Sequence, residues 1–313
     1  MKILVVGSVA YDAVETPEGK RESQLGGSAV YFSVSASYFT DVGIVGVVGE
    51  DFSAADRAGL KSHGIDISGL ETAPGNTFRW SGHYLDDINT AVTRETQLNV
   101  FETFRPRLAP AHARAPFLFL ANIDPRLQNA VLDEMIGRPT MVACDTMNLW
   151  IDIARPQLTS LLGRVDALLI NESEARQYTN EAHLPAAARR LLDAGPSTLV
   201  IKRGEYGAAL FNQEFNFAAP AYPLMKVVDP TGAGDSFAGG FMGYLAATGR
   251  TDEQALRTAA VVGSTMASFA VESFGLERLN SLTHQEIGRR FTEFVGLTRF
   301  DPISAGNGLP ANK

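Results

Sequence analysis

Residues 229–242 read Asp-Pro-Thr-Gly-Ala-Gly-Asp-Ser-Phe-Ala-Gly-Gly-Phe-Met, which combines a glycine turn, a carboxylate and the start of an apolar helix. Gly232 and Gly234 free the backbone to curl, so that successive N–H groups can point at one spot. Apolar residues then recur at helical spacing, at Ala233, Phe237 and Phe241. A helix N-terminus that follows glycines binds anions, because its unpaired N–H groups and its dipole both favour negative charge. The stretch therefore predicts an anion site at the start of a buried helix.

Asp235 lies in the first turn of that helix, where its carboxylate would repel a bound anion. The Asp235 carboxylate and a bound phosphate can share this site when a proton lies between them, as in phosphoryl transfer. The backbone of Gly232, Ala233, Gly234 and Asp235 then holds the developing charge, while Asp235 accepts the proton of an acceptor hydroxyl. The alternative is that Asp235 only benefits from the helix dipole. The whole fourteen-residue stretch favours the catalytic interpretation.

The composition indicates an ordinary globular protein. The chain has 313 residues, enough for one large domain or two smaller ones, and 45% of them are hydrophobic. The formal net charge of −8 argues against a general nucleic-acid or anionic-membrane surface. A small anionic ligand remains compatible with this charge, because local backbone donors can bind phosphate.

The single cysteine, Cys144, excludes an intramolecular disulfide and is typical of a reducing cytoplasm. It lies in an apolar run, so a buried structural thiol is expected rather than a nucleophile. The N-terminus shows no signal-peptide pattern and no stretch approaches about eighteen apolar residues, so we expect a cytoplasmic protein without a membrane partner. Residues 301–313 are rich in Gly, Pro, Asn and Ser and predict a flexible tail.

Short apolar runs alternate with helical patterns along most of the chain. The predicted strands are Ile3–Val6, Val42–Val48, Phe117–Leu120, Met141–Cys144, Ala167–Ile170 and Leu199–Ile201. The predicted helices are Ala29–Phe39, Ala54–His63, Arg126–Ile136, Glu172–Tyr178, Ala186–Asp193, Asp252–Ala270 and Thr283–Phe294. This alternation predicts an α/β fold around a mostly parallel sheet.

The region from Asn76 to Phe104 breaks this rhythm. Aromatic and β-branched residues alternate there with polar ones around an Asp-Asp-Ile-Asn turn at residues 86–89. That pattern predicts an antiparallel hairpin rather than another strand–helix–strand unit.

The 229–242 stretch resembles the C-terminal signature of the ribokinase-like (PfkB) family of carbohydrate and nucleoside kinases, and weaker matches follow the family's order over residues 1–298. The resemblance implies one kinase domain at residues 1–300. It implies a three-layer α/β/α body with a mostly parallel central sheet and a small β-sheet lid at about 11–24 and 76–104. It further implies an ATP-dependent kinase that uses Mg²⁺ and phosphorylates a hydroxymethyl group of a small sugar or nucleoside. By family analogy, the lid also mediates a homodimer.

The resemblance places the acceptor near Asp12, Gly26 and Gly27. Asp12 matches a family aspartate that hydrogen-bonds acceptor hydroxyls, although a loop aspartate can also simply cap a turn. The glycine pair lets the acceptor approach the backbone in the family, although a helix start explains it equally. Family sugar kinases often place an asparagine soon afterwards, where this chain has Val30-Tyr31-Phe32. This departure argues against an acceptor like that of ribokinase.

The resemblance also assigns residues to ATP and to metal ions. Asn171 and Glu174 match the family's Asn-x-x-Glu motif, with Glu174 supporting Mg²⁺ through water, while the same pair resembles a helix cap. The nucleotide-binding turn follows a strand and includes Lys202, Gly204 and Gly207. The nucleotide-binding positions of the family also match Thr231, Gly232 and Gly234. Asp229 and Thr231 match positions that bind a monovalent cation (K⁺) in some relatives.

Other kinds of site find little support. A P-loop motif is absent from the sequence, as is a dinucleotide-binding glycine motif after the first strand. The histidines are scattered without metal-ligand spacing, at positions 63, 83, 112, 183 and 284.

Three alternatives for function remain open. Aromatic residues in the hairpin (Phe78, Trp80, Phe101) and Tyr31 could stack a nucleobase, or the hairpin aromatics could only pack the lid or a dimer contact. Arg79 and Arg94 would suit a kinase of phosphorylated sugars, or could be solvated arginines. A non-catalytic sugar- or nucleoside-sensing protein on the same fold is the third reading.

Overall fold

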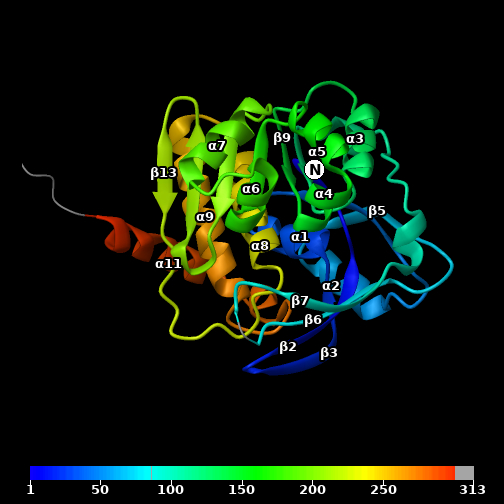
Figure 1. The fold of residues 1–313 in the computed structure, drawn as a ribbon. Helices are drawn as coiled ribbons and strands as arrows, with labels where there is room; N and C mark the ends of the chain where they lie inside the picture. The colour runs from blue at the N-terminus through cyan, green and yellow to red at the C-terminus, as the bar shows by residue number, and fades with distance from the viewer. Residues whose placement is uncertain (86, 300–313) are drawn as a thin grey trace, which may run out of the picture.

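The computed structural model describes residues 1–85 and 87–299, which form a large and a small sheet (Figure 1). The large sheet has nine strands in the order β13-β12-β11-β10-β9-β8-β1-β4-β5. These strands are β1 (Ile3–Val6), β4 (Val42–Val48), β5 (Asp66–Thr72), β8 (Phe117–Leu120), β9 (Met141–Asp145), β10 (Ala167–Asn171), β11 (Thr198–Lys202), β12 (Ala208–Asn212) and β13 (Asn216–Ala219). The pairings of β12 with β11 and with β13 are antiparallel, and the other pairings in this sheet are parallel. The tail predicted at residues 301–313 and Asp86 lie outside the described residues.

Helices cover both faces of the large sheet (Figure 1). Alternate residues of β1 enter different hydrophobic cores, Ile3 and Val5 one of them and Leu4 and Val6 the other. The first core includes α1 (Ser28–Ser37), α8 (Ala233–Thr248) and α9 (Glu253–Ala270). The second includes α3 (Pro125–Glu134), α5 (Arg155–Leu162), α6 (Glu172–Thr179) and α7 (Leu184–Asp193). The predicted three-layer α/β/α body with a mostly parallel sheet is confirmed.

The predicted strands and helices are all present, with some ends shifted. The helix predicted at Arg126–Ile136 begins at Pro125, because Asp124 caps it by accepting the Arg126 N–H, and it ends at Glu134. The sequence analysis missed β5, β12 and β13. Only Leu70 is buried in β5, so that strand lacks the continuous apolar run of the inner strands. The short helices α2 (Ala54–Ser62), α4 (Asn148–Ile153) and α10 (Glu277–Asn280) complete the body with α11 (His284–Thr298).

The small sheet projects from the body at the bottom of Figure 1. Its strand order is β3-β2-β6-β7, built from β2 (Ala10–Thr16), β3 (Gly19–Gly26), β6 (Phe78–His83) and β7 (Val92–Gln97). The hairpin predicted in the 76–104 region is confirmed, since β6 and β7 pair antiparallel. A parallel pairing of β2 with β6 joins the two hairpins, so that segments far apart in the sequence form one small sheet.

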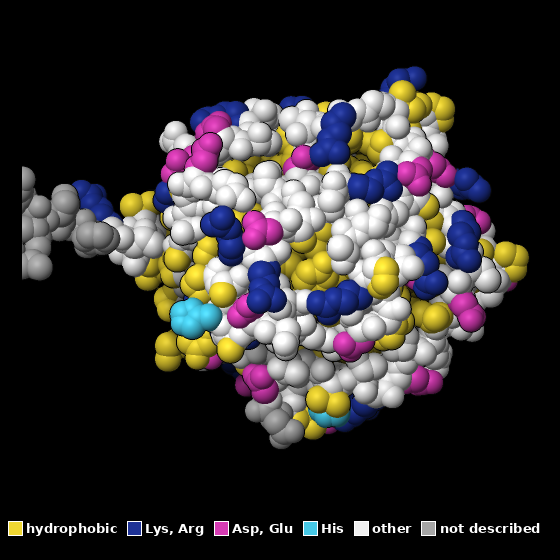
Figure 2. All heavy atoms as spheres, turned by 45° about the horizontal axis from the view of Figure 1, so that its top comes forward, with side chains coloured by type: hydrophobic (Ala, Val, Ile, Leu, Met, Phe, Trp, Pro, Cys, Tyr) yellow, Lys and Arg dark blue, Asp and Glu magenta, His cyan; other side chains and the backbone are white. Residues whose placement is uncertain are grey.

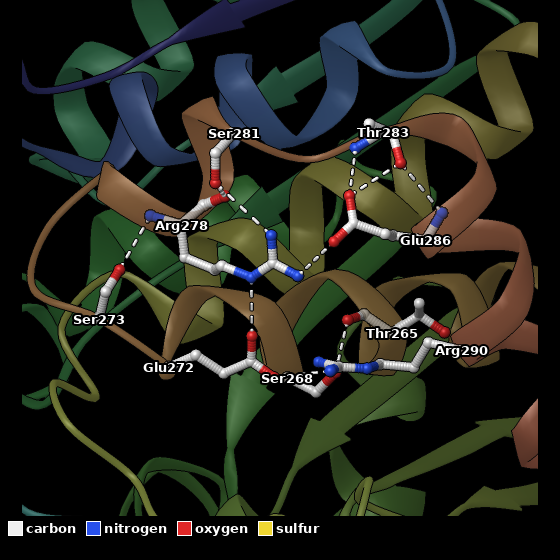
Figure 3. Close-up of polar contacts among 9 residues, drawn as sticks. All are labelled: Thr265, Ser268, Glu272, Ser273, Arg278, Ser281, Thr283, Glu286 and Arg290. Carbon is white, nitrogen blue, oxygen red and sulfur yellow. Dashed lines mark hydrogen bonds and ion pairs between the residues drawn. The ribbon is translucent and has the colours of Figure 1, made fainter.

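A polar network fixes the last helices to the end of α9 (Figure 3). Glu272 accepts hydrogen bonds from Arg278 at 2.9 Å and from Arg290 at 2.6 Å. Both guanidinium groups also lie over the ring of Phe269, at 5.0 Å and 3.6 Å from its centroid. This network holds the loop after α9, in which the Gly275 N–H donates to the Asp229 carboxylate at 3.2 Å.

The surface carries charges of both signs. On the face that Figure 2 turns forward, basic side chains lie beside acidic ones rather than in one patch. Within the described residues, no helix combines the length and the apolar character needed to cross a bilayer.

Candidate active site

The carboxyl ends of the parallel strands bring predicted site residues to one edge of the large sheet. Strand β9 ends at Asp145, β10 at Asn171 and β11 at Lys202, and Asn171 pairs with Lys202 in register. The start of α8 reaches the same edge, because the Lys202 ammonium nitrogen lies 3.1 Å from the point where a Cβ on Gly234 would stand. Residues from distant parts of the chain therefore meet here.

The predicted anion turn leads into α8. Gly232 is the residue before the helix and has φ 75° and ψ 1°, in the left-handed region. The ring of Tyr31 lies against it, since a Cβ on Gly232 would stand 2.3 Å from Tyr31 Cγ. Both the backbone conformation and the ring require glycine. The Ala233 N–H donates to the carbonyl of Pro230 at 3.2 Å and the Ser236 N–H to that of Gly232 at 2.8 Å, while the first-turn amides of Gly234 and Asp235 find no backbone acceptor among the described residues.

Asp235 is partly exposed at the start of α8, so a ligand can reach its carboxyl group. Its low-polarity surroundings, together with the nearby Asp145 and Asp12 carboxylates, raise its pKa to about 8, while the Lys202 ammonium opposes this shift. A carboxylate with a pKa near the working pH is suited to accept and release a proton.

Asp145 is a site residue that the sequence analysis missed. Its carboxylate lies 2.7 Å from the Lys202 ammonium, and the two side chains are 6% and 17% exposed. The predicted strand stopped at Cys144, so the aspartate was not considered. The available signal was a carboxylate at the carboxyl end of a buried strand, the position where α/β proteins bind ligands.

Asp12 lies at the other side of the site, against the glycine pair. It is 5% exposed, and a Cβ on Gly26 would stand 2.0 Å from its Oδ2 atom. Burial and the Asp229 carboxylate raise the pKa of Asp12 to about 7, against a hydrogen bond from the Gly27 backbone. Gly27 has φ 96°, a conformation that glycine adopts without strain. The structure therefore brings Asp12, Gly26 and Gly27 together as predicted.

Tyr31 lies near both Asp12 and the turn at Gly232. Its ring is fully buried, and its hydroxyl finds no hydrogen-bond partner among the described residues. Burial and the neighbouring Asp12 and Asp229 carboxylates raise its pKa well above the ordinary value, so the hydroxyl stays protonated and can donate. A buried hydroxyl without a partner is costly unless a ligand satisfies it.

The surroundings of Glu174 fit a hydrated Mg²⁺ ion. Asn171 and Glu174 form a complete capping box at the start of α6, which confirms the helix-cap reading of this pair. Glu174 is also buried, and burial and Asp145 raise its pKa to about 7. Carboxylates here outnumber the ammonium of Lys202, and a divalent cation would compensate the excess charge. In the described part of the chain, no three His, Cys, Asp or Glu side chains gather closely enough to hold a metal ion together.

The surroundings of Asp229 do not fit a monovalent cation. Its Oδ1 atom accepts the Thr231 N–H at 2.9 Å, and its Oδ2 atom accepts the Gln24 amide at 3.0 Å and the Gly275 N–H at 3.2 Å. A potassium ion would need oxygen atoms where these N–H donors stand. Thr231 itself donates to the hydroxyl of Tyr84 at 3.3 Å.

The predicted nucleotide turn joins β11 to β12. Gly204 and Gly207 have φ of 55° and 84°, and the Arg203 N–H donates to the Gly207 carbonyl at 2.8 Å. A side chain on Gly204 would collide with Asn89 of the small sheet, so the tip of that sheet reaches the turn. Lys202 is the last residue of β11, immediately before the turn, and its ammonium donates to Asp145. Nucleotide contact by these residues stays a prediction.

The predicted aromatic and basic residues of the small sheet contact partners in that sheet or in the segments beside it. Phe78 stacks on Phe101 with ring centroids 5.4 Å apart, and the Trp80 indole donates to Thr93 at 3.1 Å. Arg79 pairs with Asp51 at 2.7 Å, and Arg94 pairs with Glu15 at 2.6 Å. The aromatic contacts favour the interpretation that these rings pack the sheet. Arg79 and Arg94 are already paired with carboxylates, which argues against the phosphosugar alternative.

The sequence of this chain matches the model of a known protein family. The model of the pfkB family of carbohydrate kinases matches residues 1–281. This chain belongs to the pfkB family. The family resemblance that the sequence predicted is thus confirmed, and this PfkB protein is a carbohydrate or nucleoside kinase with a ribokinase-like fold.

The individual relatives of this PfkB kinase carry names of nucleoside or sugar kinases. It is 31% identical over 263 residues to the cytidine kinase of Thermococcus kodakarensis, covering 82% of this chain and 92% of that protein. Its structure is similar to that of the Burkholderia thailandensis nucleoside kinase in complex with ADP-inosine, with TM-score 0.76, 18% identity and coverage of 94% and 96%. It is also similar to a putative ribokinase II from E. coli in complex with ATP and Mg²⁺, with TM-score 0.75, 18% identity and coverage of 93% and 99%.

Proposed function

We propose that this PfkB kinase transfers the γ-phosphate of ATP to a hydroxymethyl group of a nucleoside, with Asp235 as the general base. The observation that carries the proposal is the placement of a reachable carboxylate with a raised pKa at the N-terminus of α8, beside a buried ammonium. The nucleoside is preferred over a free sugar because the cytidine kinase relative is 31% identical to this chain. The run Val30-Tyr31-Phe32, where family sugar kinases often place an asparagine, agrees with this preference.

The residues divide into an acceptor side and a phosphoryl side. Asp12 accepts hydrogen bonds from acceptor hydroxyls, and the Gly26–Gly27 backbone permits close approach. Asp235 takes the proton of the attacking hydroxyl, which contributes about 10²–10⁴-fold to the rate. The amides of Gly234 and Asp235 stabilise charge on the transferring phosphoryl group, and one such donor is worth about 10²–10³-fold.

ATP and Mg²⁺ are the cofactors that this proposal requires. Asn171 and Glu174 would hold the hydrated ion, and when bound it neutralises charge on the phosphate oxygens. The Gly204–Gly207 turn would contact the nucleotide, with Asn89 of the small sheet above it. Dimerisation through the small sheet stays a prediction, which sedimentation would test.

A coupled ADP-release assay over nucleosides, pentoses, hexoses and phosphosugars tests the function. We expect turnover with a nucleoside at a kcat/KM at least about tenfold above that of any sugar, the discrimination that about 1.4 kcal/mol provides. A higher value with a free sugar would move the acceptor to the carbohydrates. Tight binding of a nucleoside with no ADP release from any acceptor would favour the sensing protein.

Replacing Tyr31 with phenylalanine tests whether its hydroxyl binds the acceptor. We expect the KM for the nucleoside to rise about fivefold to tenfold, as for loss of one hydrogen bond, while the KM for ATP stays unchanged. Tyr38→Phe is the matched control, because the Tyr38 hydroxyl donates to the Leu279 carbonyl away from the site. An unchanged nucleoside KM together with a higher Tm would mean that the Tyr31 hydroxyl is only an unsatisfied buried group.

A further inference from the structure

Lys202 is fixed at the phosphoryl side of the site by a buried ion pair. Its ammonium lies 2.7 Å from Asp145 Oδ2, and both side chains are largely removed from solvent. Burial opposes the charge on Lys202, but the Asp145 and Glu174 carboxylates outweigh burial and raise its pKa. The side chain therefore carries a permanent positive charge.

The Lys202 ammonium lies close to the anion turn because residue 234 is a glycine and has no Cβ. A Cβ on Gly234 would stand 3.1 Å from Lys202 Nζ, with the Cδ and Cε atoms of Lys202 at 3.7 Å. The ammonium thus lies directly against the backbone whose N–H groups begin α8. Backbone donors and a side-chain cation converge on one spot, which is what stabilisation of a transferring phosphoryl group requires.

Asp145 is itself held firmly. Its Oδ1 atom accepts the Thr146 N–H at 2.8 Å, so that Oδ2 is left to face Lys202. Its backbone carbonyl accepts the buried Gln128 amide at 3.0 Å, and β9 pairs with strands on both sides. The carboxylate can therefore direct the flexible lysine side chain, which would otherwise sample many rotamers.

We propose that Lys202 is the side-chain cation that binds the transferring phosphoryl group, and that Asp145 is the positioning residue that holds it there. The inference rests on the kinase function proposed above and assigns roles beyond it. The competing explanation is purely structural: Lys202 would only neutralise the carboxylates that face it, namely Asp145, Glu174 and Asp235. The two explanations differ in whether the lysine recognises the γ-phosphate.

Binding of nucleotides and steady-state kinetics distinguish them in Lys202→Met, Asp145→Asn and the double variant. For Lys202→Met we expect kcat to fall about 10²–10³-fold with little change in the nucleoside KM. Its affinity for the non-hydrolysable ATP analogue AMP-PNP should fall about tenfold, while its affinity for ADP is retained. Asp145→Asn should lower kcat about tenfold, and it should cost nothing further in the Lys202→Met background, because it acts through the lysine.

Asp166→Asn is the matched control, since Asp166 forms an ion pair with Arg138 at 2.6 Å immediately before β10, away from the carboxyl ends of the strands. It should leave kcat and both affinities unchanged. Normal kcat and AMP-PNP affinity in Lys202→Met, with only a lower Tm, would overturn the proposal, as would multiplying losses in the double variant. Should Lys202→Met fail to fold, Asp145→Asn decides, and an unchanged ratio of AMP-PNP to ADP affinity would reject it. Absence of turnover in the wild type would refute the kinase function alone, because the affinity ratio is measured without turnover.

Discussion

Asp235→Asn is expected to lower kcat about 10²–10⁴-fold while ATP still binds. Asparagine keeps the size and polarity of the side chain but cannot accept the proton of the acceptor hydroxyl. Because the ionised carboxylate is the base, kcat/KM of the wild type should rise with pH and level off above about 8. The residual activity of the variant should lack this rise.

The same substitution should stabilise the protein at alkaline pH. Burial, Asp145 and Asp12 raise the folded-state pKa of Asp235 to about 8, above the value of about 4 in an unfolded chain. Stability from this group is therefore full below about pH 4 and is lost as the pH rises through about 8. Asparagine removes the charge, so the Tm of Asp235→Asn should exceed that of the wild type by about 2–4 °C at about pH 8.5.

Glu253→Gln provides the control for Asp235→Asn, because Glu253 is an acidic residue in the first turn of the neighbouring helix α9. It should leave kcat and its pH profile unchanged. An Asp235→Asn enzyme that turns over near the wild-type rate would remove Asp235 from the mechanism and reduce it to a residue that the helix dipole favours.

Gly232→Ala is expected to lower kcat by at least about two orders of magnitude, the value of a lost oxyanion-type donor. The alanine Cβ would stand 2.3 Å from Tyr31 Cγ, and φ at this residue is 75°. Relief of either conflict rotates the turn and redirects the amides of Gly234 and Asp235. Steady-state kinetics with saturating nucleoside and ATP, combined with thermal unfolding, would measure the effect.

Gly249→Ala separates backbone strain from the loss of the anion turn. Gly249 has φ 65° and ends the same helix, and the position that a Cβ would take there is open. Its replacement should lower Tm through backbone strain alone, because alanine is forced into the left-handed region there without meeting another side chain. The loss should therefore be smaller than for Gly232→Ala. Activity should survive only in Gly249→Ala. Equal activities of the two variants would show that the 232–235 backbone does not bind the phosphoryl group.

Much of the fold could be predicted because its signals are local. Apolar runs such as Val42–Val48 and Ala167–Ile170 indicate strands buried on both faces, and helical spacing of apolar residues appears within single segments. The strands that were missed carry no such run. In β5 only Leu70 is buried, since an edge strand covers less of the core and its composition is correspondingly polar.

In the candidate site too, features built from neighbouring residues could be predicted, whereas contacts between distant residues could not. The glycine turn before α8 could be recognised from the sequence, because contiguous residues supply its backbone donors, its carboxylate and its helix. The partner of Lys202 could not, since Asp145 lies 57 positions earlier. Nor could the surroundings of Asp229, whose carboxylate accepts a hydrogen bond from the Gln24 amide, 205 positions earlier in the chain.

The sequence by itself therefore determined the family, the layered α/β body and the position of the phosphate turn, because each depends on neighbouring residues along the chain. Only the tertiary structure decided that Tyr31 packs on Gly232, that Asp145 holds Lys202 and that N–H donors surround Asp229. Such contacts arise where strands and helices from separate segments converge. Their geometry depends on how the whole core packs, and no local pattern records it.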